Sequence, residues 1–122
     1  MRVDVVREYM NEKIQTTAKR LVTLLVAHDF AGLEEWSQGV RLKREQMAEA
    51  LNQYPGYFVM PPEPTVPYLD VVEVIDSSPK QWSVDIPLWT QEEGRSDLTM
   101  QVTMIESENE MMNVEIDDIH VL

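Results

Sequence analysis

Two histidines with carboxylates as near neighbours are the residues of this chain best suited to general base chemistry. Asp29 directly follows His28, and Asp117 and Asp118 closely precede His120. A histidine paired with a carboxylate can accept and return a proton near neutral pH. A structural interpretation is also open, in which His28 ends a helix and Asp29 caps the next one. No third group is evident for either pair, so we predict no catalytic residue.

A second group of side chains could hold a hard cation, because carboxylates are the ligands that calcium prefers. These carboxylates belong to Glu92, Glu93, Asp97, Asp117 and Asp118. Their spacing does not match the EF-hand loop, which alternates oxygen ligands around a central glycine. The segment is more simply a solvated turn, in which Gly94 allows a positive φ and Arg95 pairs with acidic neighbours. We predict no metal and, because the 4 glycines are far apart, no nucleotide cofactor.

Charge is distributed very unevenly along the chain. The formal net charge is −12, yet residues 1–50 carry as many basic as acidic side chains. Residues 51–122 hold fourteen acidic residues and only two basic ones, Lys80 and Arg95. A strongly negative region steers positively charged molecules towards it, so we expect a basic protein partner. The same charge disfavours nucleic acid and anionic membranes as partners, because both are polyanions.

Composition also bears on domain number and location. The 122 residues suit one domain of ordinary size, predicted to span residues 1–122. The absence of cysteine excludes disulfides and thiol nucleophiles and fits a reducing cytoplasm. The N-terminus has no apolar stretch typical of a signal peptide, and the longest apolar run, Leu21 to Ala27, is too short to cross a bilayer. We therefore expect a cytoplasmic protein.

The elements that must position these side chains begin with helices, over residues 1–54. Apolar residues recur every three or four positions over residues 3–28, which predicts one or two helices with a core-facing stripe. The same spacing predicts further helices at Phe30–Trp36 and Leu42–Tyr54. Lys43 stands where a serine or aspartate cap is expected, so we predict a poorly capped start for the third helix.

A proline-rich connection, residues 55–67, joins the helices to residues 68–122, which have the pattern of a sheet. Strands are predicted at Tyr68–Ile75, Trp82–Leu88, Leu98–Met104 and Met111–Leu122, separated by the turn Ser77–Lys80, the polar loop Thr90–Asp97 and the turn Glu106–Glu110. Pro87 removes one ladder donor and predicts an edge position or a strand end.

The last predicted strand changes its apolar parity half way along. Its apolar residues are even-numbered before Asp117 and odd-numbered after Asp118: Met112, Val114, Ile116, Ile119 and Val121. One extra residue at this point would return the apolar side chains to a single face. The pattern therefore predicts a β-bulge, a feature that often re-aims side chains near functional sites.

Helices followed by hairpin-spaced strands predict an α+β fold, with the helices on one face of a curved, mainly antiparallel sheet of about four strands. The other face would be polar and negative, with Ser83, Asp85, Thr99, Gln101, Thr103, Asn113, Glu115 and Asp117 on it. Parity places Trp89 on the face opposite Trp82. Trp89 is either an exposed binding anchor with an acidic rim or a side chain buried under the prolines of residues 61–67.

Three segments resemble an uncharacterised family of short bacterial proteins: Trp82–Thr99 (WSVDIPLWTQEEGRSDLT, with the stretch PLWTxEEGRSDLT), Glu115–Leu122 (EIDDIHVL) and His28–Trp36. The family has no known activity, so this resemblance implies nothing about chemistry. Its layout is similar to the cystatin-like roll of nuclear transport factor two, which implies a cone of helices and curved sheet around a pocket.

Three functions are compatible with these features. The first is a non-enzymatic interaction domain for a basic protein, in its sharpest form an immunity-type inhibitor of a basic bacterial toxin such as a nuclease. Its docking residues would be Asp85, Trp89, Glu92, Glu93, Arg95, Asp97, Glu115, Asp117 and Asp118. The second is a ligand-binding or enzymatic roll with a His–Asp pair and a pocket lined by Trp36, Tyr54, Tyr57 and Phe58. The third is a homodimer without a separate ligand.

Overall fold

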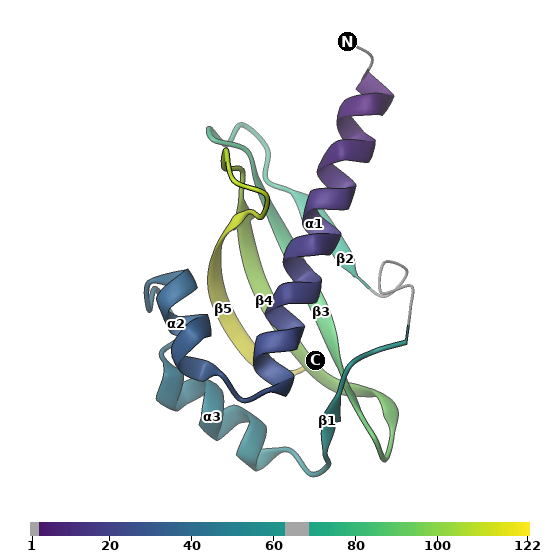
Figure 1. Ribbon diagram of the computed structural model, residues 1–122, viewed down its shortest axis with the longest axis vertical. Helices are drawn as coiled ribbons and strands as arrows, with labels where there is room; N and C mark the ends of the chain where they lie inside the picture. The colour runs from purple at the N-terminus through teal and green to yellow at the C-terminus, as the bar shows by residue number, and fades with distance from the viewer. Residues whose placement is uncertain (1–2, 63–68) are drawn as a thin grey trace.

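A computed structural model describes residues 3–62 and 69–122, in which three helices precede the main strands of one sheet (Figure 1). The elements are α1 (Val3–Val26), α2 (Phe30–Ser37), α3 (Arg44–Gln53), β1 (Phe58–Val59), β2 (Asp70–Glu73), β3 (Gln81–Thr90), β4 (Gly94–Ile105) and β5 (Asn113–Val121). This order of elements confirms the predicted α+β fold.

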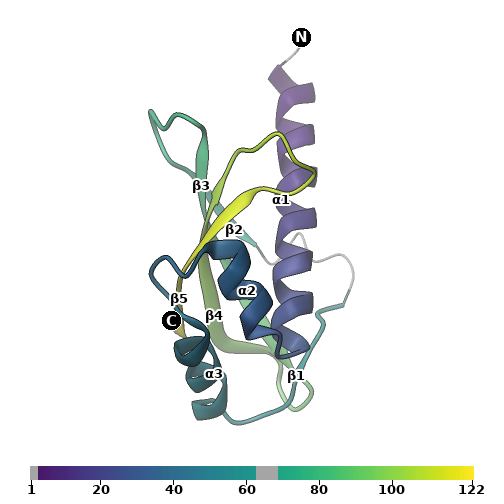
Figure 2. The same ribbon diagram turned by 60° about the vertical axis from the view of Figure 1, so that its left-hand side comes forward.

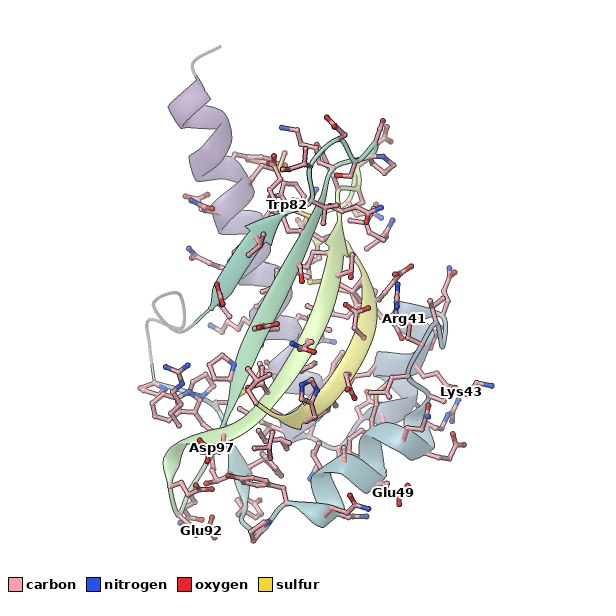
Figure 3. The ribbon with its side chains drawn as sticks, turned by 180° about the vertical axis from the view of Figure 1, so that it is seen from behind. Arg41, Lys43, Glu49, Trp82, Glu92 and Asp97 are labelled. Atoms are coloured by element: carbon pink, nitrogen blue, oxygen red, sulfur yellow. The ribbon has the colours of Figure 1, made fainter. Side chains whose placement is uncertain are left out.

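The sheet is antiparallel and has five strands in the described residues, one more than the approximate number predicted. Its order is β1-β3-β4-β5, and β2 also pairs with β3, beyond the end of β1. Helix α1 crosses one face of the sheet, and α2 and α3 pack beside β5 (Figures 1 and 2). Seen from behind, the opposite face of β2, β3, β4 and β5 is open (Figure 3).

Alternating side chains of the two long central strands form the core, as the sequence pattern predicts. The buried residues of these strands include Trp82, Val84, Ile86, Leu88, Leu98, Met100, Val102 and Met104. They meet the buried stripe of α1, which consists of Ile14, Thr17, Ala18, Leu21, Val22 and Leu25, with Lys13 at its N-terminal end. Burial of these apolar surfaces is the main source of stability for such a layered fold.

Two polar residues within the buried stripe of α1 hold the loop between β4 and β5. The Thr17 hydroxyl donates to the Lys13 carbonyl at 2.7 Å and accepts the Met112 N–H at 3.0 Å. The Lys13 ammonium donates to the Ser107 carbonyl. Because buried backbone groups need partners, these bonds fix residues 106–112 against the helix.

The predicted β-bulge is confirmed at Asp117. Gln101 of β4 faces Asp118, whereas the next residue, Val102, faces Ile116, so Asp117 is the extra residue. Ile116 and Ile119 are consequently both buried on the helix side. The carboxylates of residues 117 and 118 are left on the open side of the sheet.

The polar loop predicted at residues 90–97 is wrong in extent. β3 and β4 stay paired up to Thr90 and Gly94, so only residues 91–93 make the turn. Gly94 has a φ of +75°, as the turn prediction requires. A register shift between Pro87 and Trp89 interrupts the hydrogen-bond ladder between β3 and β4. At this point the buried Ser96 hydroxyl donates to the Leu88 carbonyl at 2.8 Å. The polar composition of residues 94–97 predicted a loop, but these residues belong to β4, where the Ser96 hydroxyl forms an internal hydrogen bond.

The environment of Pro87 explains how a proline is tolerated inside a ten-residue strand. β2 pairs with residues 82–85 of β3, and β1 pairs with residues 89–90. Among the described residues, no strand pairs with Pro87 on that side, so the prediction of an edge position holds locally.

Two parts of the strand prediction need adjustment. The proline-rich connection contains the short strand β1, and residues 63–67 of that connection lie outside the described residues, as does Tyr68. The strand predicted at Tyr68–Ile75 is four residues long in β2 and is exposed throughout. The valines of β2 therefore face solvent rather than the core.

Helix α3 begins without a capping side chain at Lys43, as predicted, but another helix supplies the missing acceptor. The carboxylate of Glu34 in α2 accepts the Arg44 N–H at 2.8 Å. The same carboxylate pairs with the Arg44 guanidinium at 2.9 Å. The Gln46 side chain accepts the Lys43 N–H at 2.9 Å. The start of α3 is thus held by its connection to α2.

Membrane insertion through a helix finds no support in the described residues, because none of their helices has both the length and the apolar character that crossing a bilayer requires.

Candidate acidic docking face

Three carboxylates form a row across the open face of the sheet. In the strand register, Asp70 of β2 faces Asp85 of β3, Asp85 faces Gln101 of β4, and Gln101 faces Asp118 of β5. Residues directly opposite in an antiparallel sheet point to the same side. We call Asp70, Asp85 and Asp118 the acidic row. The sequence prediction included Asp85 and Asp118 but not Asp70, because the register that aligns β2 is not visible in the sequence.

A second, weaker line of polar residues runs beside the acidic row. Ser83, Thr103 and Glu115 are opposite one another in β3, β4 and β5, and Val72 continues the line in β2. The face therefore combines carboxylates with hydroxyls and one exposed valine. No helix covers it in the view from behind (Figure 3).

Asp117 lies on this face but is already engaged within the protein. Its carboxylate accepts the Thr103 hydroxyl at 2.8 Å and pairs with the Arg41 Nε at 3.0 Å. Partial burial raises the pKa of Asp117 above its ordinary value of 3.8, although Thr103 and Arg41 act in the opposite direction. Asp118 accepts the Ile119 N–H at 2.9 Å and lies next to His120, but its side chain is 53% exposed, so it is the more available docking charge of the two.

Arg41 links the helical layer to this end of the face. It lies between α2 and α3 with a φ of 70°, and its backbone forms a parallel bridge with Ile116 of β5. From there its guanidinium reaches Asp117 and, at 3.6 Å, Glu115. The positive charge of Arg41 thus compensates part of the negative charge of β5, beside which Arg41 lies (Figure 3). No sequence signal pairs residues so far apart, so this link was missed.

The other predicted docking residues lie at the β3–β4 turn, and two of them have internal roles. A carboxylate oxygen of Glu92 accepts the Tyr57 N–H at 2.8 Å, and one of Glu93 accepts the Tyr54 hydroxyl at 2.7 Å. The hydrogen bond to Glu93 raises the pKa of Tyr54. These bonds attach the turn to the segment after α3. Asp97 is exposed, and its N–H donates to the Tyr54 oxygen at 3.3 Å.

Trp89 occupies a position between the two predicted alternatives. It is half-buried and lies opposite Val59 of β1 and Arg95 of β4. Arg95 is exposed, and no ion pair between described residues includes it, so the predicted pairing with its acidic neighbours is wrong. Whether residues 63–67 cover the indole lies outside the described part of the chain.

The two histidines are in different environments. His28 is exposed at the end of α1 and stacks on Phe30 with ring centroids 5.5 Å apart, while Asp29 caps α2 by accepting the Gly32 N–H. This is the structural interpretation that the sequence offered. His120 Nδ1 lies 2.9 Å from the Asp118 carboxylate, so these two predicted partners are in contact, but the geometry is not that of a hydrogen bond.

A shallow groove of about 290 Å³ lies beside His120, between α3 and β5. Its lining includes Tyr54 and Ile119 as well as His120. Of the other proposed pocket residues, Phe58 is buried in the core, Tyr57 is 67% exposed, and the Trp36 indole donates to the Met112 carbonyl. These aromatic residues are not gathered around one cavity.

Within residues 3–62 and 69–122, no three His, Asp or Glu side chains are grouped closely enough to hold a metal ion. The carboxylates considered as cation ligands are divided between the β3–β4 turn and β5, where hydrogen bonds and Arg41 engage several of them. The arrangement is suited to charge recognition over a surface rather than to coordination.

Comparison with known proteins assigns the chain to a family. A family model described as "Domain of unknown function (DUF7668)" matches residues 22–122, so the chain belongs to that family. Neither the curated proteins nor the solved structures contain a match.

Proposed function

Starting from membership of this family, whose activity is unknown, we propose that the chain is a non-enzymatic interaction domain that binds a basic protein through the open face of its sheet. The observation that carries the proposal is the acidic row, Asp70, Asp85 and Asp118, on a face without a helix over it. Carboxylates arranged in this way attract a positive surface over a distance and fix its orientation on contact.

The net charge of −12 supports the same partner class. Arg41 neutralises part of the face at Glu115 and Asp117, so the charge available for docking is concentrated on the acidic row. Self-repulsion among these carboxylates would be relieved by a basic partner, which adds to the attraction at low salt. The β3–β4 turn has a secondary role, because its two glutamates already hold the turn in place.

In its sharpest form the proposal is an immunity-type inhibitor that blocks a basic bacterial toxin in the cytoplasm. Small size, absence of cysteine and an acidic face support this form. We also propose that the chain is related in fold to the cystatin-like roll of nuclear transport factor two. The support for this relationship is the order of the elements, helices followed by a sheet.

The test is capture of a partner from the lysate of the source organism, with this chain as bait and washes of increasing salt. Three baits are compared: the native chain, the variant D70N/D85N/D118N and the control E106Q/E108Q/E110Q. Both variants remove three negative charges, but the control removes them from the loop after β4. We expect one basic protein to be captured by the native chain and by the control, and to be lost from the first variant.

Equal capture by all three baits would show that net charge, rather than the acidic row, attracts the partner. Capture of no basic protein by any bait would contradict the proposal itself. Because the substitutions are on exposed or half-buried positions of a folded sheet, circular dichroism of each bait checks that the fold is retained.

A second candidate is a small ligand in the groove beside His120, which the contact between His120 and Asp118 favours. A ligand seated there would change the environment of the imidazole. An NMR titration of both histidines against a small-molecule collection tests it, with the exposed His28 as the internal control. Ligand-dependent shifts confined to His120 would support this function, and their absence would remove it.

A further inference from the structure

Strand β2 lies at an edge of the sheet that the described residues form. It pairs with β3 on one side, and within the described residues no strand pairs with it on the other. Every residue of β2 is exposed, including Val71 at 39% and Val72 at 59%. Exposed edges with apolar side chains are the sites at which a further strand is added, unless the protein blocks them.

The direction of the backbone groups of β2 follows from one hydrogen bond. The Val74 N–H donates to the Gln81 carbonyl of β3 at 2.9 Å. Because backbone direction alternates along an antiparallel pair, residues 70 and 72 also point their N–H and C=O groups towards β3. Val71 and Glu73 point theirs away from β3, towards the open edge.

The two sides of this edge differ in chemistry. On the open face of the sheet, Asp70 is the last member of the acidic row, so an added strand would extend that row next to Asp70. On the helix side, Val71 lines a groove of about 180 Å³ with Ile14 and Gln15 of α1 and with Leu69. A strand with basic side chains on one face and β-branched side chains on the other is complementary to both.

A second copy of the chain is a poorer occupant of the same edge. Each copy would bring its own Asp70 and Glu73 to the shared edge, and each copy carries a net charge of −12. Two such edges repel each other electrostatically. These acidic residues therefore select a basic strand and disfavour self-association.

From these observations we infer that the free edge of β2 receives an extended segment of the basic partner by strand addition. Lysine or arginine residues of that segment lie beside Asp70 and the acidic row, and its β-branched residues face the groove between β2 and α1. The inference rests on the proposed function for the charge of the partner, and adds the backbone edge through which it binds. Main-chain hydrogen bonds to Val71 and Glu73 supply the pairing.

The test uses a blocked synthetic peptide, acetyl-Lys-Val-Lys-Val-Arg-Val-Lys-amide, titrated into the isotopically labelled chain and followed by NMR and amide hydrogen exchange. We expect the Val71 and Glu73 amides to become protected, because they would donate to the peptide. The same peptide with N-methyl groups on alternate residues cannot complete the ladder and should bind at least about tenfold more weakly.

The decisive variant is Val71→Pro, which removes an outward-pointing donor without removing a β2–β3 hydrogen bond. We expect at least about a tenfold loss of peptide affinity. The matched control is Val121→Pro on β5, at the opposite edge. Leu122 N–H donates to Asp97, so by the same alternation the Val121 N–H also points outwards. It should leave peptide affinity unchanged.

The outcomes separate the inference from the proposed function. Unchanged peptide affinity in V71P, with loss in D70N/D85N/D118N, would overturn strand addition and leave the acidic docking face standing. Loss in V71P without loss in D70N/D85N/D118N would support the edge and contradict the charge argument. Absence of binding to the native chain, or a dimer in sedimentation that V71P abolishes, would overturn strand addition by a partner.

Discussion

Asp117 shows how a carboxylate predicted as a docking residue is used within the fold. The bulge leaves it without a directly opposite residue in β4. The Thr103 hydroxyl donates to one of its carboxylate oxygens, and Arg41 forms an ion pair with the other. Removal from water nevertheless raises its pKa above the ordinary value of 3.8. The folded state therefore binds this proton more tightly than the unfolded chain does.

The substitution Asp117→Asn tests this balance through pH. Ionisation of Asp117 costs stability as pH rises through the interval from 3.8 to the raised pKa, so the native chain loses stability there and the variant does not. The effect should stay below about 1 kcal/mol, because the site is partly solvated. Urea unfolding at acidic and neutral pH measures it. A native chain that gains stability relative to D117N across the interval would contradict the account.

Glu92 and Glu93 illustrate the same ambiguity of single residues. In the sequence they look like solvated turn residues or a rim for Trp89, and in the structure they accept hydrogen bonds from Tyr57 and Tyr54. Their partners lie in the segment after α3, and no local pattern links the two segments. Residue type alone therefore could not separate docking carboxylates from structural ones.

Among the elements, α3 depends on a neighbour for its start. Glu34 accepts the Arg44 N–H, and Arg44 lowers the pKa of Glu34 below its ordinary value of 4.5. The stabilisation that this carboxylate provides is present above pH 4.5 and is lost as pH falls through the lowered pKa.

Glu34→Gln should lower the unfolding temperature at neutral pH, because it weakens the capping bond and removes the ion pair with Arg44. The adjacent Glu35→Gln serves as the control, since none of the ion pairs between described residues includes Glu35. Thermal unfolding by circular dichroism measures both. Equal shifts for the two variants would show that Glu34 does not cap α3.

Helix α1 holds the β4–β5 loop through Thr17, and Thr17→Val tests that link. The variant keeps the shape of the side chain but leaves the buried Met112 N–H without an acceptor, so we expect a loss of about 1–3 kcal/mol. Thr23→Val on the same helix loses the bonds of an exposed hydroxyl to the Lys19 carbonyl and the Met60 sulfur, and is the matched control. Chemical denaturation of both variants measures the change in the free energy of unfolding. A loss for T17V no larger than that for T23V would contradict the role.

The sequence was sufficient for elements with strong periodicity. The apolar alternation of β3 and β4, the capping of α2 by Asp29 and the parity change at Asp117 each identified a local structure that the chain adopts. It failed where tertiary contacts override local composition. The polar segment after Thr90 is mostly strand, because Ser96 satisfies the interrupted ladder from within. The two-residue β1 has no pattern of its own.

At the scale of the whole molecule, the candidate site is a product of register. Asp85 and Asp118 were predicted individually. Their alignment with Asp70 depends on the register of three strand pairs, β2–β3, β3–β4 and β4–β5. Arg41, between α2 and α3, balances some of this charge at Glu115 and Asp117, and no helix covers the acidic row. The charge of the molecule is therefore asymmetric: the open face of the sheet is negative, and the helical layer on the other side carries balanced charge.

The central claim is that this row steers a basic partner, and the association rate constant of the captured protein tests it most directly. Rates would be measured by stopped-flow at low and high ionic strength for the native chain, D70N/D85N/D118N and E106Q/E108Q/E110Q. We predict that the first variant associates about tenfold more slowly at low salt and that this difference shrinks at high salt. The control should stay close to the native rate. Equal rates for the two variants, or a native rate independent of salt, would contradict the account.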